Sequence, residues 1–221
     1  MEQPRHDTVG IVLAGGGSTR LASVAVAGGG KASLMFHGQT FLEHVIAAVA
    51  TEVDDVIVVA APGQTLPALD GASIVHDLTP GSGPLAGIRD GLLAALAARG
   101  TTAPPPRFAV VASCDLPLLR REVVRLLLQV AVESDSLWTV PIVHGHRQVL
   151  MSVIRVELLP QIEAWLATGR RDLRGLVAEL ARDDPRSVRE VTEAELAAVD
   201  PERVSFVDID TPDDLERLQS R

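Results

Sequence analysis

Residues 9–20 read V-G-I-V-L-A-G-G-G-S-T-R, in which an apolar run passes directly into three glycines. The run Val9–Leu13 carries no charged residue, and such runs are typical of a strand that is buried on both faces of a sheet. Glycines directly after a strand predict a loop whose backbone can approach a ligand closely. This stretch therefore predicts a parallel sheet with a ligand-binding loop at the carboxyl end of its first strand.

Outward from this stretch, strands and helices alternate over roughly the first 130 residues. Thr40 and Glu43 stand at the start of an amphipathic segment, in the spacing of a helix that begins with a capping box. Continuous apolar strands that alternate with helices favour an α/β fold, a three-layer, mainly parallel, Rossmann-like sheet covered on both faces. The predicted strands are Asp55–Ala60, Ser73–His76 and Phe108–Ser113, and the predicted helices are Phe41–Ala50, Leu85–Arg99 and Arg121–Val132.

The pattern changes in the second half of the chain. Two apolar segments flank a polar turn at His144–Arg147, which predicts a small antiparallel excursion from the parallel sheet. Thr211 precedes the last helical segment as its predicted cap. We expect a single domain over residues 1–221, with the region of about 137–182 on the substrate side. The strands predicted here are Leu137–Val143, Val149–Ile154 and Val204–Ile209, and the helices are Leu158–Ala167, Leu173–Ala181 and Pro212–Gln219.

The composition limits the classes of protein to which the chain can belong. With 29 acidic and 20 basic residues the formal net charge is −9, whereas nucleic acids and anionic membranes bind basic surfaces. No stretch is apolar over the roughly 18 residues of a membrane span, and Met1–Thr8 does not resemble a signal peptide. Cys114 is the single cysteine, which excludes an internal disulfide. We expect a cytoplasmic enzyme without nucleic-acid or membrane partners.

The basic residues are uneven in type. The chain has 19 arginines but one lysine, Lys31, which ends the glycine-rich stretch 13–31. Lysine places a compact charge on a flexible stem, which arginine does not reproduce. Together with Arg20, it favours a phosphate loop, in which backbone N–H groups and two cations would surround a polyphosphate. A surface turn rich in small residues is the alternative, since the loop matches neither a Walker loop nor the dinucleotide-binding fingerprint.

Acidic residues mark two further strand ends. Asp115 follows the predicted strand Phe108–Ser113 after one cysteine, and Asp208 and Asp210 lie at the end of Val204–Ile209. Ligands of open parallel sheets bind beyond the carboxyl ends of the strands. We therefore expect these carboxylates and the glycine loop to lie at one site.

With these features, the chain resembles the MobA-like nucleotidyltransferases through four blocks in the same order. I-V-L-A-G-G-G-S-T-R at 11–20 is similar to the family's opening signature, and G-P-L-A-G-I at 83–88 to its G-P-L-A-G block. V-V-A-S-C-D-L-P-L-L at 110–119 resembles its metal-site block, and D-I-D-T-P-D-D-L at 208–215 its terminal N-x-N-T-P-E-D-L. The resemblance spans roughly residues 9–219 and implies a sheet of the nucleotide-diphospho-sugar transferase type.

The resemblance also implies a reaction and the residues that carry it out. Within the family, the chain is similar to the branch that transfers GMP from GTP to the terminal phosphate of molybdopterin carrying molybdenum, with release of pyrophosphate. Mg²⁺ is the implied cofactor, and transient contact with molybdopterin-handling proteins or apo-molybdoenzymes is implied as well. The implied catalytic residues are Arg20, Lys31 and Asp115. The implied nucleotide-binding residues are Leu13, Ala14, Gly15, Gly16, Lys31, Asp77 and Asp115, and the implied metal ligands are Asp115 and Asp210.

Two departures from the family pattern leave other activities open. Residues 22–30 form a glycine-rich insertion between Arg20 and Lys31, and Asp210 stands where the family commonly has asparagine. The alternatives are a CTP-dependent molybdopterin cytidylyltransferase, a nucleotidyltransferase for another small phosphate, and a non-enzymatic nucleotide-binding module. The cytidylyl-transferring branch usually opens with L-A-A-G, so the resemblance at Gly15 and Gly16 implies guanine rather than cytosine. The candidate substrate-binding residues on the acceptor side are Arg147, Arg170 and Asp208.

Overall fold

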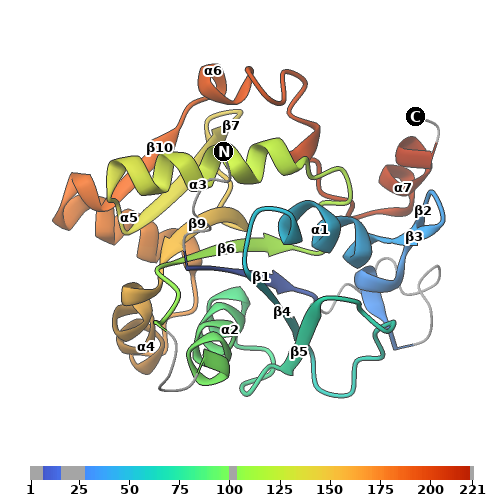
Figure 1. Ribbon diagram of the computed structural model, residues 1–221, viewed down its shortest axis with the longest axis horizontal. Helices are drawn as coiled ribbons and strands as arrows, with labels where there is room; N and C mark the ends of the chain where they lie inside the picture. Colours follow the sequence, from blue (N-terminus) through green and yellow to red (C-terminus); the bar gives the residue numbers. More distant parts are fainter. Residues whose placement is uncertain (1–6, 16–27, 100–103, 220–221) are drawn as a thin grey trace.

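The computed structural model describes residues 7–15, 28–99 and 104–219, and within these ranges an eight-stranded sheet runs through the molecule (Figure 1). The strand order is β10-β7-β9-β6-β1-β4-β5, and β8 pairs with β7 beside this path. The strands are β1 (Thr8–Leu13), β4 (Asp55–Ala60), β5 (Ala72–His76), β6 (Phe108–Ser113), β7 (Trp138–Val143), β8 (His146–Arg147), β9 (Met151–Arg155) and β10 (Val188–Val191).

The sheet is mainly parallel, as the sequence predicts. β4 and β6 flank β1 and run parallel to it, and β5 extends the parallel half beyond β4. β9 is antiparallel to both β6 and β7, which confirms the expected antiparallel excursion, and β10 pairs in parallel with β7. The carboxyl ends of β1, β4, β5, β6 and β7 therefore share one edge of the sheet, toward which the arrowheads of β1 and β6 point in Figure 1.

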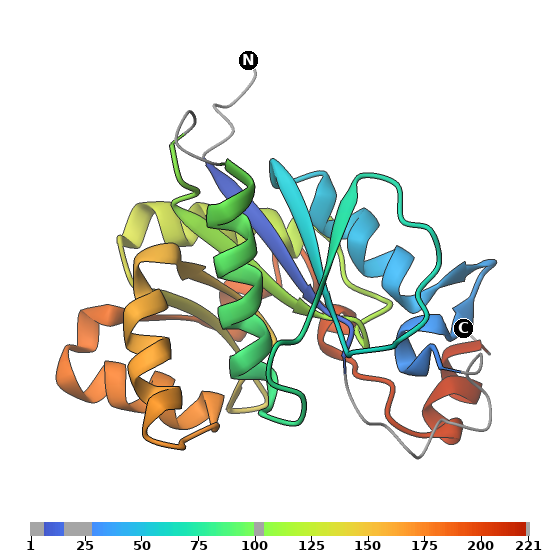
Figure 2. The ribbon, with the colours of Figure 1, turned by 90° about the horizontal axis from the view of Figure 1, so that it is seen from below.

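Helices cover both faces of the sheet and give the predicted three layers (Figures 1 and 2). Successive residues of a strand point to opposite faces, so Val12 packs in one core with α1 and α3, and Ile11 packs in another with α2, α4 and α5. No helix in the described ranges is long and apolar enough to cross a membrane. The helices are α1 (Phe41–Ala50), α2 (Pro84–Arg99), α3 (Arg121–Ser134), α4 (Leu159–Ala167), α5 (Leu173–Asp183), α6 (Glu193–Leu196) and α7 (Pro212–Gln219).

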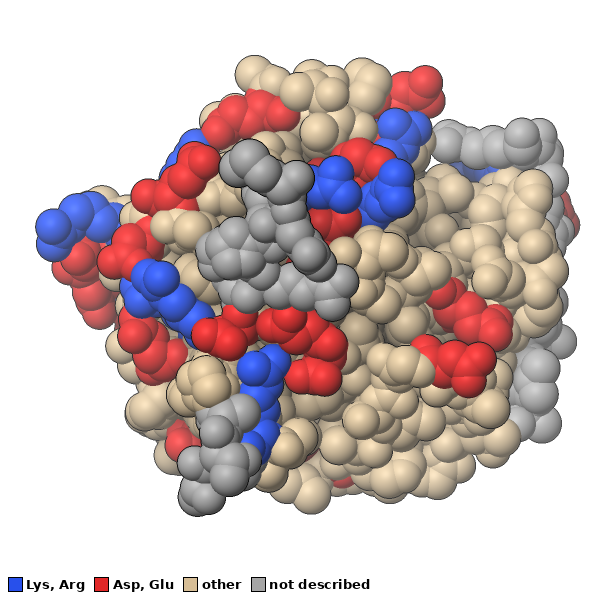
Figure 3. Space-filling view, in the orientation of Figure 1, with Lys and Arg blue, Asp and Glu red and all other residues tan. Residues whose placement is uncertain are grey.

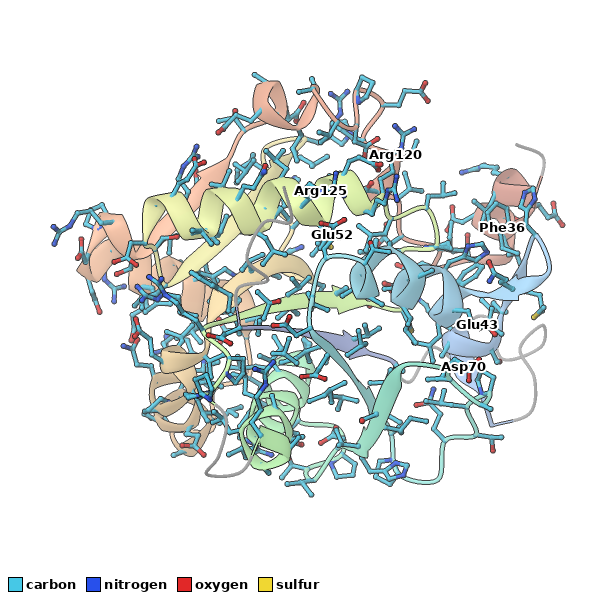
Figure 4. All side chains as sticks on the ribbon, viewed as in Figure 1. Phe36, Glu43, Glu52, Asp70, Arg120 and Arg125 are labelled. Carbon is cyan, nitrogen blue, oxygen red and sulfur yellow. The ribbon has the colours of Figure 1, made fainter. Side chains whose placement is uncertain are left out.

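The predicted capping box at the start of α1 is present. The Glu43 N–H donates to Thr40 Oγ1 at 3.2 Å, and the Thr40 N–H donates to Glu43 Oε2 at 2.6 Å. These bonds from Thr40 lower the pKa of the Glu43 carboxyl. Beyond the other end of α1, Glu52 accepts two hydrogen bonds from Arg125 on α3, at 2.7 and 3.0 Å, and the two side chains point toward each other in Figure 4. The capping box thus fixes the residue at which α1 begins, and the ion pair connects the end of α1 to α3.

Acidic and basic side chains lie intermixed on the surface. On the left and upper parts of the face shown in Figure 3, red and blue groups are neighbours, whereas the right-hand part is mostly tan with separate red groups. The ion pairs of Arg182 with Glu179 and of Arg186 with Asp184 are of this exposed kind. Exposed pairs of this type contribute little to stability, so the cores rather than the surface charges hold the fold.

The segment Val204–Ile209 is not a strand, so that prediction is wrong. Val204–Phe206 form one turn of 3₁₀-helix, and residues 207–210 have no regular secondary structure and pair with no strand of the described chain. The buried Asp200 carboxylate accepts the N–H groups of Val204 and Ser205, at 3.2 and 2.9 Å, which satisfies donors that a sheet would otherwise use. An apolar run does not distinguish these outcomes by its pattern alone.

Three small β elements are absent from the sequence prediction: β8, β10 and a hairpin. The polar turn predicted at His144–Arg147 is shorter in the structure, because His146–Arg147 form β8 and pair with β7. β10 carries Arg189 and Glu190 in its middle, and as an edge strand it tolerates charge that conceals its pattern. β2 (Met35–Phe36) and β3 (Gln39–Thr40) form a separate hairpin. Its turn requires positive φ angles at His37 (48°) and Gly38 (81°), as two-residue hairpin turns do. This hairpin connects the Lys31 segment to α1.

Candidate active site

Lys31 and two aspartates form a charged cluster at the carboxyl edge of the sheet. Lys31 lies in a single 3₁₀ turn, Gly30–Ser33, and its Nζ donates to Asp115 Oδ2 at 3.0 Å and to Asp210 Oδ1. The side chains of Lys31 and Asp115 are 13% and 20% exposed, whereas that of Asp210 is 49% exposed. The structure thus brings together the lysine and both predicted metal ligands, with the lysine bonded to each carboxylate.

The electrostatics of the cluster follow from its composition. Burial lowers the pKa of Lys31, but the hydrogen bonds and charges of Asp210 and Asp115 outweigh burial and raise that pKa overall. The pKa of Asp208 is raised, first by burial and then by the charges of Asp210 and Asp115. The carboxylates of Asp115, Asp208 and Asp210 thus lie near a single lysine, so a further cation would be attracted to this site.

A small apolar cluster brings these groups together. Ile209 is buried among Leu34 and Phe41, which belong to the segment that follows Lys31. The Ile209 N–H also donates to the Asp115 carbonyl oxygen at 3.1 Å. Because Ile209 directly precedes Asp210, this packing places the Asp210 carboxylate against the lysine.

The donor set fits a divalent cation. Mg²⁺ takes hard oxygen ligands, retains several waters, and is typically held by one or two carboxylates together with substrate phosphates. The carboxylates of Asp115 and Asp210 already converge on one cation, the Lys31 ammonium group. No group of three or more His, Cys, Asp or Glu side chains in the described ranges is arranged to hold a metal. A metal here would therefore depend on phosphate oxygens to complete its ligands.

The end of β1 presents backbone groups rather than side chains. Leu13 and Ala14 are buried, Gly15 is exposed, and the N–H groups of Ala14 and Gly15 both donate to Val59 oxygen, at 2.9 and 3.1 Å. A Cβ on Gly15 would lie 3.0 Å from the Ala61 nitrogen, so this position requires glycine for a close approach to the end of β4. The predicted residues Gly16 and Arg20 lie outside the described residues.

Asp77 lies two strands away from this loop. β1 pairs with β4 and β4 with β5, so the end of β5 is about 10 Å from the end of β1. The Asp77 N–H donates to Ala60 oxygen at 2.8 Å, and its Oδ1 accepts the Thr79 N–H at 2.8 Å. Asp77 is thus held at the same edge as Leu13 and Gly15, on the far side of β4.

Gln64 is a residue of this edge that the sequence reasoning missed. It ends the turn that follows β4, and its side-chain amide bonds to backbone groups of Ala14, Gly29 and Ala61. A shallow hollow of about 200 Å³ lies between this turn and the glycines that precede Lys31. The signal was available, because Gln64 follows a strand end in a sheet whose strand ends were the expected site.

A second hollow, of about 140 Å³, opens on the other side of Asp115. Its lining includes two of the predicted residues, Arg147 and Asp208, together with Asp115 itself. Arg147 is held by Glu190, with its Nη2 2.6 Å from Glu190 Oε1. The lining residues are Ser113, Asp115, Leu116, Arg147, Gln148, Val149, Leu150, Met151, Arg174, Phe206 and Asp208.

The arginine that α5 contributes to this hollow differs from the predicted one. Arg170 stacks on Trp165, 3.5 Å from the ring centroid, and its Nη1 lies 3.1 Å from Glu179 Oε2. Arg174, in the first turn of α5, lines the hollow, and it forms no ion pair with the described residues. Helix-end arginines look alike in sequence. The contacts of Arg170 with Trp165 of α4 and Glu179 of α5 distinguish the two arginines in the structure.

The comparisons with known proteins place this geometry in a family. The model of the MobA-like NTP transferase domain matches residues 10–184. The chain belongs to this family. A probable molybdenum cofactor guanylyltransferase of Mycobacterium avium (strain 104) is 34% identical over 198 residues, which cover 86% of this chain and 93% of that protein.

Several solved structures have the same fold as this chain. Molybdopterin-guanine dinucleotide biosynthesis protein A of Archaeoglobus fulgidus matches with a TM-score of 0.71 at 23% identity, over 96% of this chain and 97% of that chain. The Rv0371c protein of Mycobacterium tuberculosis H37Rv, in complex with manganese, matches with a TM-score of 0.62 at 19% identity, over 96% and 98% of the two chains. At these identities the likeness supports the fold, and it confirms the predicted type of sheet.

The extent of the MobA-like match separates two groups of candidate residues. Leu13, Lys31, Asp77 and Asp115 fall within residues 10–184, as do the arginines of the acceptor side. Asp208 and Asp210 lie beyond it. Their place in the site rests on the fold of this chain, through the burial of Ile209 and its bond to Asp115.

Proposed function

We propose that the protein transfers GMP from GTP to the terminal phosphate of molybdopterin carrying molybdenum and releases pyrophosphate. The observation that carries the proposal is the position of Lys31 between Asp115 and Asp210, at the strand edge where the glycine loop begins. The name of the Mycobacterium avium relative supports this activity. We propose that the chain works as one domain in the cytoplasm. The single domain is supported by the large sheet, which includes both the first strand, β1, and the last, β10.

The chemistry requires positioning and charge neutralisation. A phosphate oxygen of the acceptor attacks the α-phosphorus of GTP, and the bond from this phosphorus to the oxygen that bridges to the β-phosphate breaks. The acceptor is already a nucleophile, so the chain needs no serine or cysteine to form a covalent intermediate. We assign to Lys31 the stabilisation of charge at the α-phosphate, and to Arg20 the departing pyrophosphate.

We assign the nucleoside to the parallel half of the edge. Leu13, Ala14, Gly15 and Gly16 would contact it from the end of β1, and Asp77 from the end of β5. The separation of these strand ends, about 10 Å across β4, suits a group of nucleoside size. Gly15 is exposed and has no side chain, so a base could approach the backbone of the loop closely at this position.

We propose Mg²⁺ as the cofactor, held by Asp115 and Asp210. When bound, the metal would supply positive charge against the triphosphate. The convergence of both carboxylates on one cation supports the assignment, and so does the manganese complex of the Mycobacterium tuberculosis relative. Lys31, released from one or both carboxylates, would then be free to contact phosphate.

We assign the acceptor to the hollow beyond Asp115. Arg147 and Asp208 line it, and Arg174 adds a cation without a carboxylate partner in the described chain. Arg170 would reach an acceptor only by leaving Trp165 and Glu179. Molybdopterin-handling proteins that deliver the acceptor, or apo-molybdoenzymes that receive the product, would make transient contacts near this hollow.

One experiment distinguishes the proposal from its alternatives. The protein is incubated with molybdopterin carrying molybdenum, Mg²⁺ and each of the four NTPs in turn, and pyrophosphate release is measured. Release with GTP is the expected result. Release with CTP alone would identify a cytidylyltransferase, and no release with any NTP, together with nucleotide binding, would identify a binding module.

A further inference from the structure

Gln64 uses its whole side-chain amide on backbone groups from three segments. Its Oε1 accepts the Ala61 N–H at 2.9 Å, and its Nε2 donates to Ala14 oxygen at 3.0 Å and to Gly29 oxygen at 2.9 Å. The Gln64 N–H also donates to Ala61 oxygen at 3.0 Å, which closes the turn. One side chain thereby joins three segments by hydrogen bonds: the end of β1, the segment before Lys31 and the turn after β4.

Neighbouring contacts reinforce the same junction. The Thr65 N–H donates to Gly28 oxygen at 3.1 Å. A Cβ on Gly29 would lie 3.3 Å from Thr65 oxygen, so this glycine also permits a close approach. Ala14 and Gly29 bound the glycine loop on its two sides, and Lys31 follows Gly29 by two residues.

We propose that Gln64 is a positioning residue for the nucleotide, because it sets the spacing between the two ends of the glycine loop. The inference rests on the proposed function, since the loop ends and Lys31 are assigned there to the nucleotide. Gln64 would act through the backbone of Ala14 and Gly29 and would not touch the reacting atoms.

The chemistry of the junction explains why the residue is glutamine. The site needs one acceptor and two donors at the end of a long side chain, and the glutamine amide supplies this combination. Glutamate has the same shape and keeps the acceptor, but it cannot donate to the two carbonyl oxygens. Methionine has a similar length and removes all three bonds without adding a charge.

The test compares Gln64→Glu and Gln64→Met with Gln129→Glu, which makes the same chemical change on the exposed side of α3. We measure the Kd of GTP by calorimetry, the KM values of GTP and molybdopterin, and the melting temperature. The loss of two hydrogen bonds at the loop ends should raise the Kd and KM of GTP about tenfold. The KM of molybdopterin should stay unchanged, and Gln129→Glu should match the wild type.

The readouts separate the inference from a merely structural role and from the proposed function. A lower melting temperature with an unchanged GTP Kd, in either folded variant, would overturn the inference, and so would equal increases in both KM values. Pyrophosphate release by the wild type tests the proposed function separately. Even if the wild type releases no pyrophosphate, the Kd of GTP can still be compared between the wild type and the variants. A wild type without affinity for GTP would overturn both.

Discussion

The two halves of the carboxyl edge are built differently. On the β1–β4–β5 side, the edge consists mostly of backbone, with Gly15 exposed and the loop ends held by Gln64. On the β6–β9–β7 side, charged side chains line a hollow, among them Arg147, Arg174 and Asp208. The first half is parallel throughout, whereas β9 reverses direction in the second.

This difference indicates two kinds of recognition. Backbone groups at a close approach suit a nucleoside, whose hydrogen-bonding edge is planar and uncharged. Arginine side chains suit an acceptor that carries a phosphate. The Lys31 cluster lies at the boundary, because β1 and β6 are neighbours and Asp115 follows β6. The predictions below test whether the halves act separately and whether the boundary serves both.

The largest effect is expected at the boundary. Asp115→Asn keeps the size of the side chain but removes the charge that would hold a divalent metal and pair with Lys31. Activity should fall on the order of a thousandfold, because Asp115 lies between the proposed sites of both substrates. Pyrophosphate release and circular dichroism measure activity and folding. Asp55→Asn, at the opposite end of the sheet where Asp55 pairs with Arg99, is the control and should stay active. Near-normal turnover by Asp115→Asn would place the metal elsewhere.

The second prediction concerns the single lysine. Lys31→Arg keeps the charge but replaces a compact ammonium group by a planar guanidinium, in a side chain that is 13% exposed between two carboxylates. Turnover should fall about a hundredfold, with a smaller change in GTP binding. Arg125→Lys, an exchange in the exposed pair with Glu52, is the matched control. Full activity of Lys31→Arg would mean that the lone lysine is an accident of composition.

The third prediction separates the halves. Arg174→Ala removes a cation that lines the acceptor hollow and should raise the KM of molybdopterin about tenfold, with the KM of GTP unchanged. Arg182→Ala on the same helix, where Arg182 pairs with Glu179 and Asp183, should change neither value. Arg170→Ala tests the residue that the sequence favours. A larger effect of Arg170→Ala than of Arg174→Ala would reverse their assignment.

The smallest effect is expected away from the edge. Thr40→Ala removes the cap of α1 and should lower the free energy of unfolding by about 1 kcal/mol, with both KM values unchanged. The Thr40 bonds lower the pKa of Glu43 in the folded protein, so their contribution is complete above the ordinary value of 4.5. It is lost as the pH falls through the lowered pKa. The stability difference between the two proteins, measured by urea unfolding, should therefore shrink in acid, and a constant difference would contradict this.

Much of the fold could be predicted because it is encoded locally. The limits of α1 and β6 coincide with those read from the sequence, since caps and apolar runs act over a few residues. The exceptions have local causes as well. Asp200 accepts hydrogen bonds from N–H groups of Val204 and Ser205 that a strand would need for pairing. Charged residues in the middle of β10 hide the apolar pattern by which a strand is predicted.

By itself, the sequence determined the alternation of strands and helices, the glycine loop after β1, and an aspartate at the end of β6. Tertiary structure alone decided which side chains meet there. Lys31 bonds to aspartates that are 84 and 179 residues away, and Gln64 joins backbone groups that are 50 and 35 residues away. It also decided that Arg174 lines the acceptor hollow while Arg170 stacks on Trp165. The physical reason is range: caps and periodic patterns act within a few residues, whereas these contacts depend on the order of strands and on the burial of Ile209.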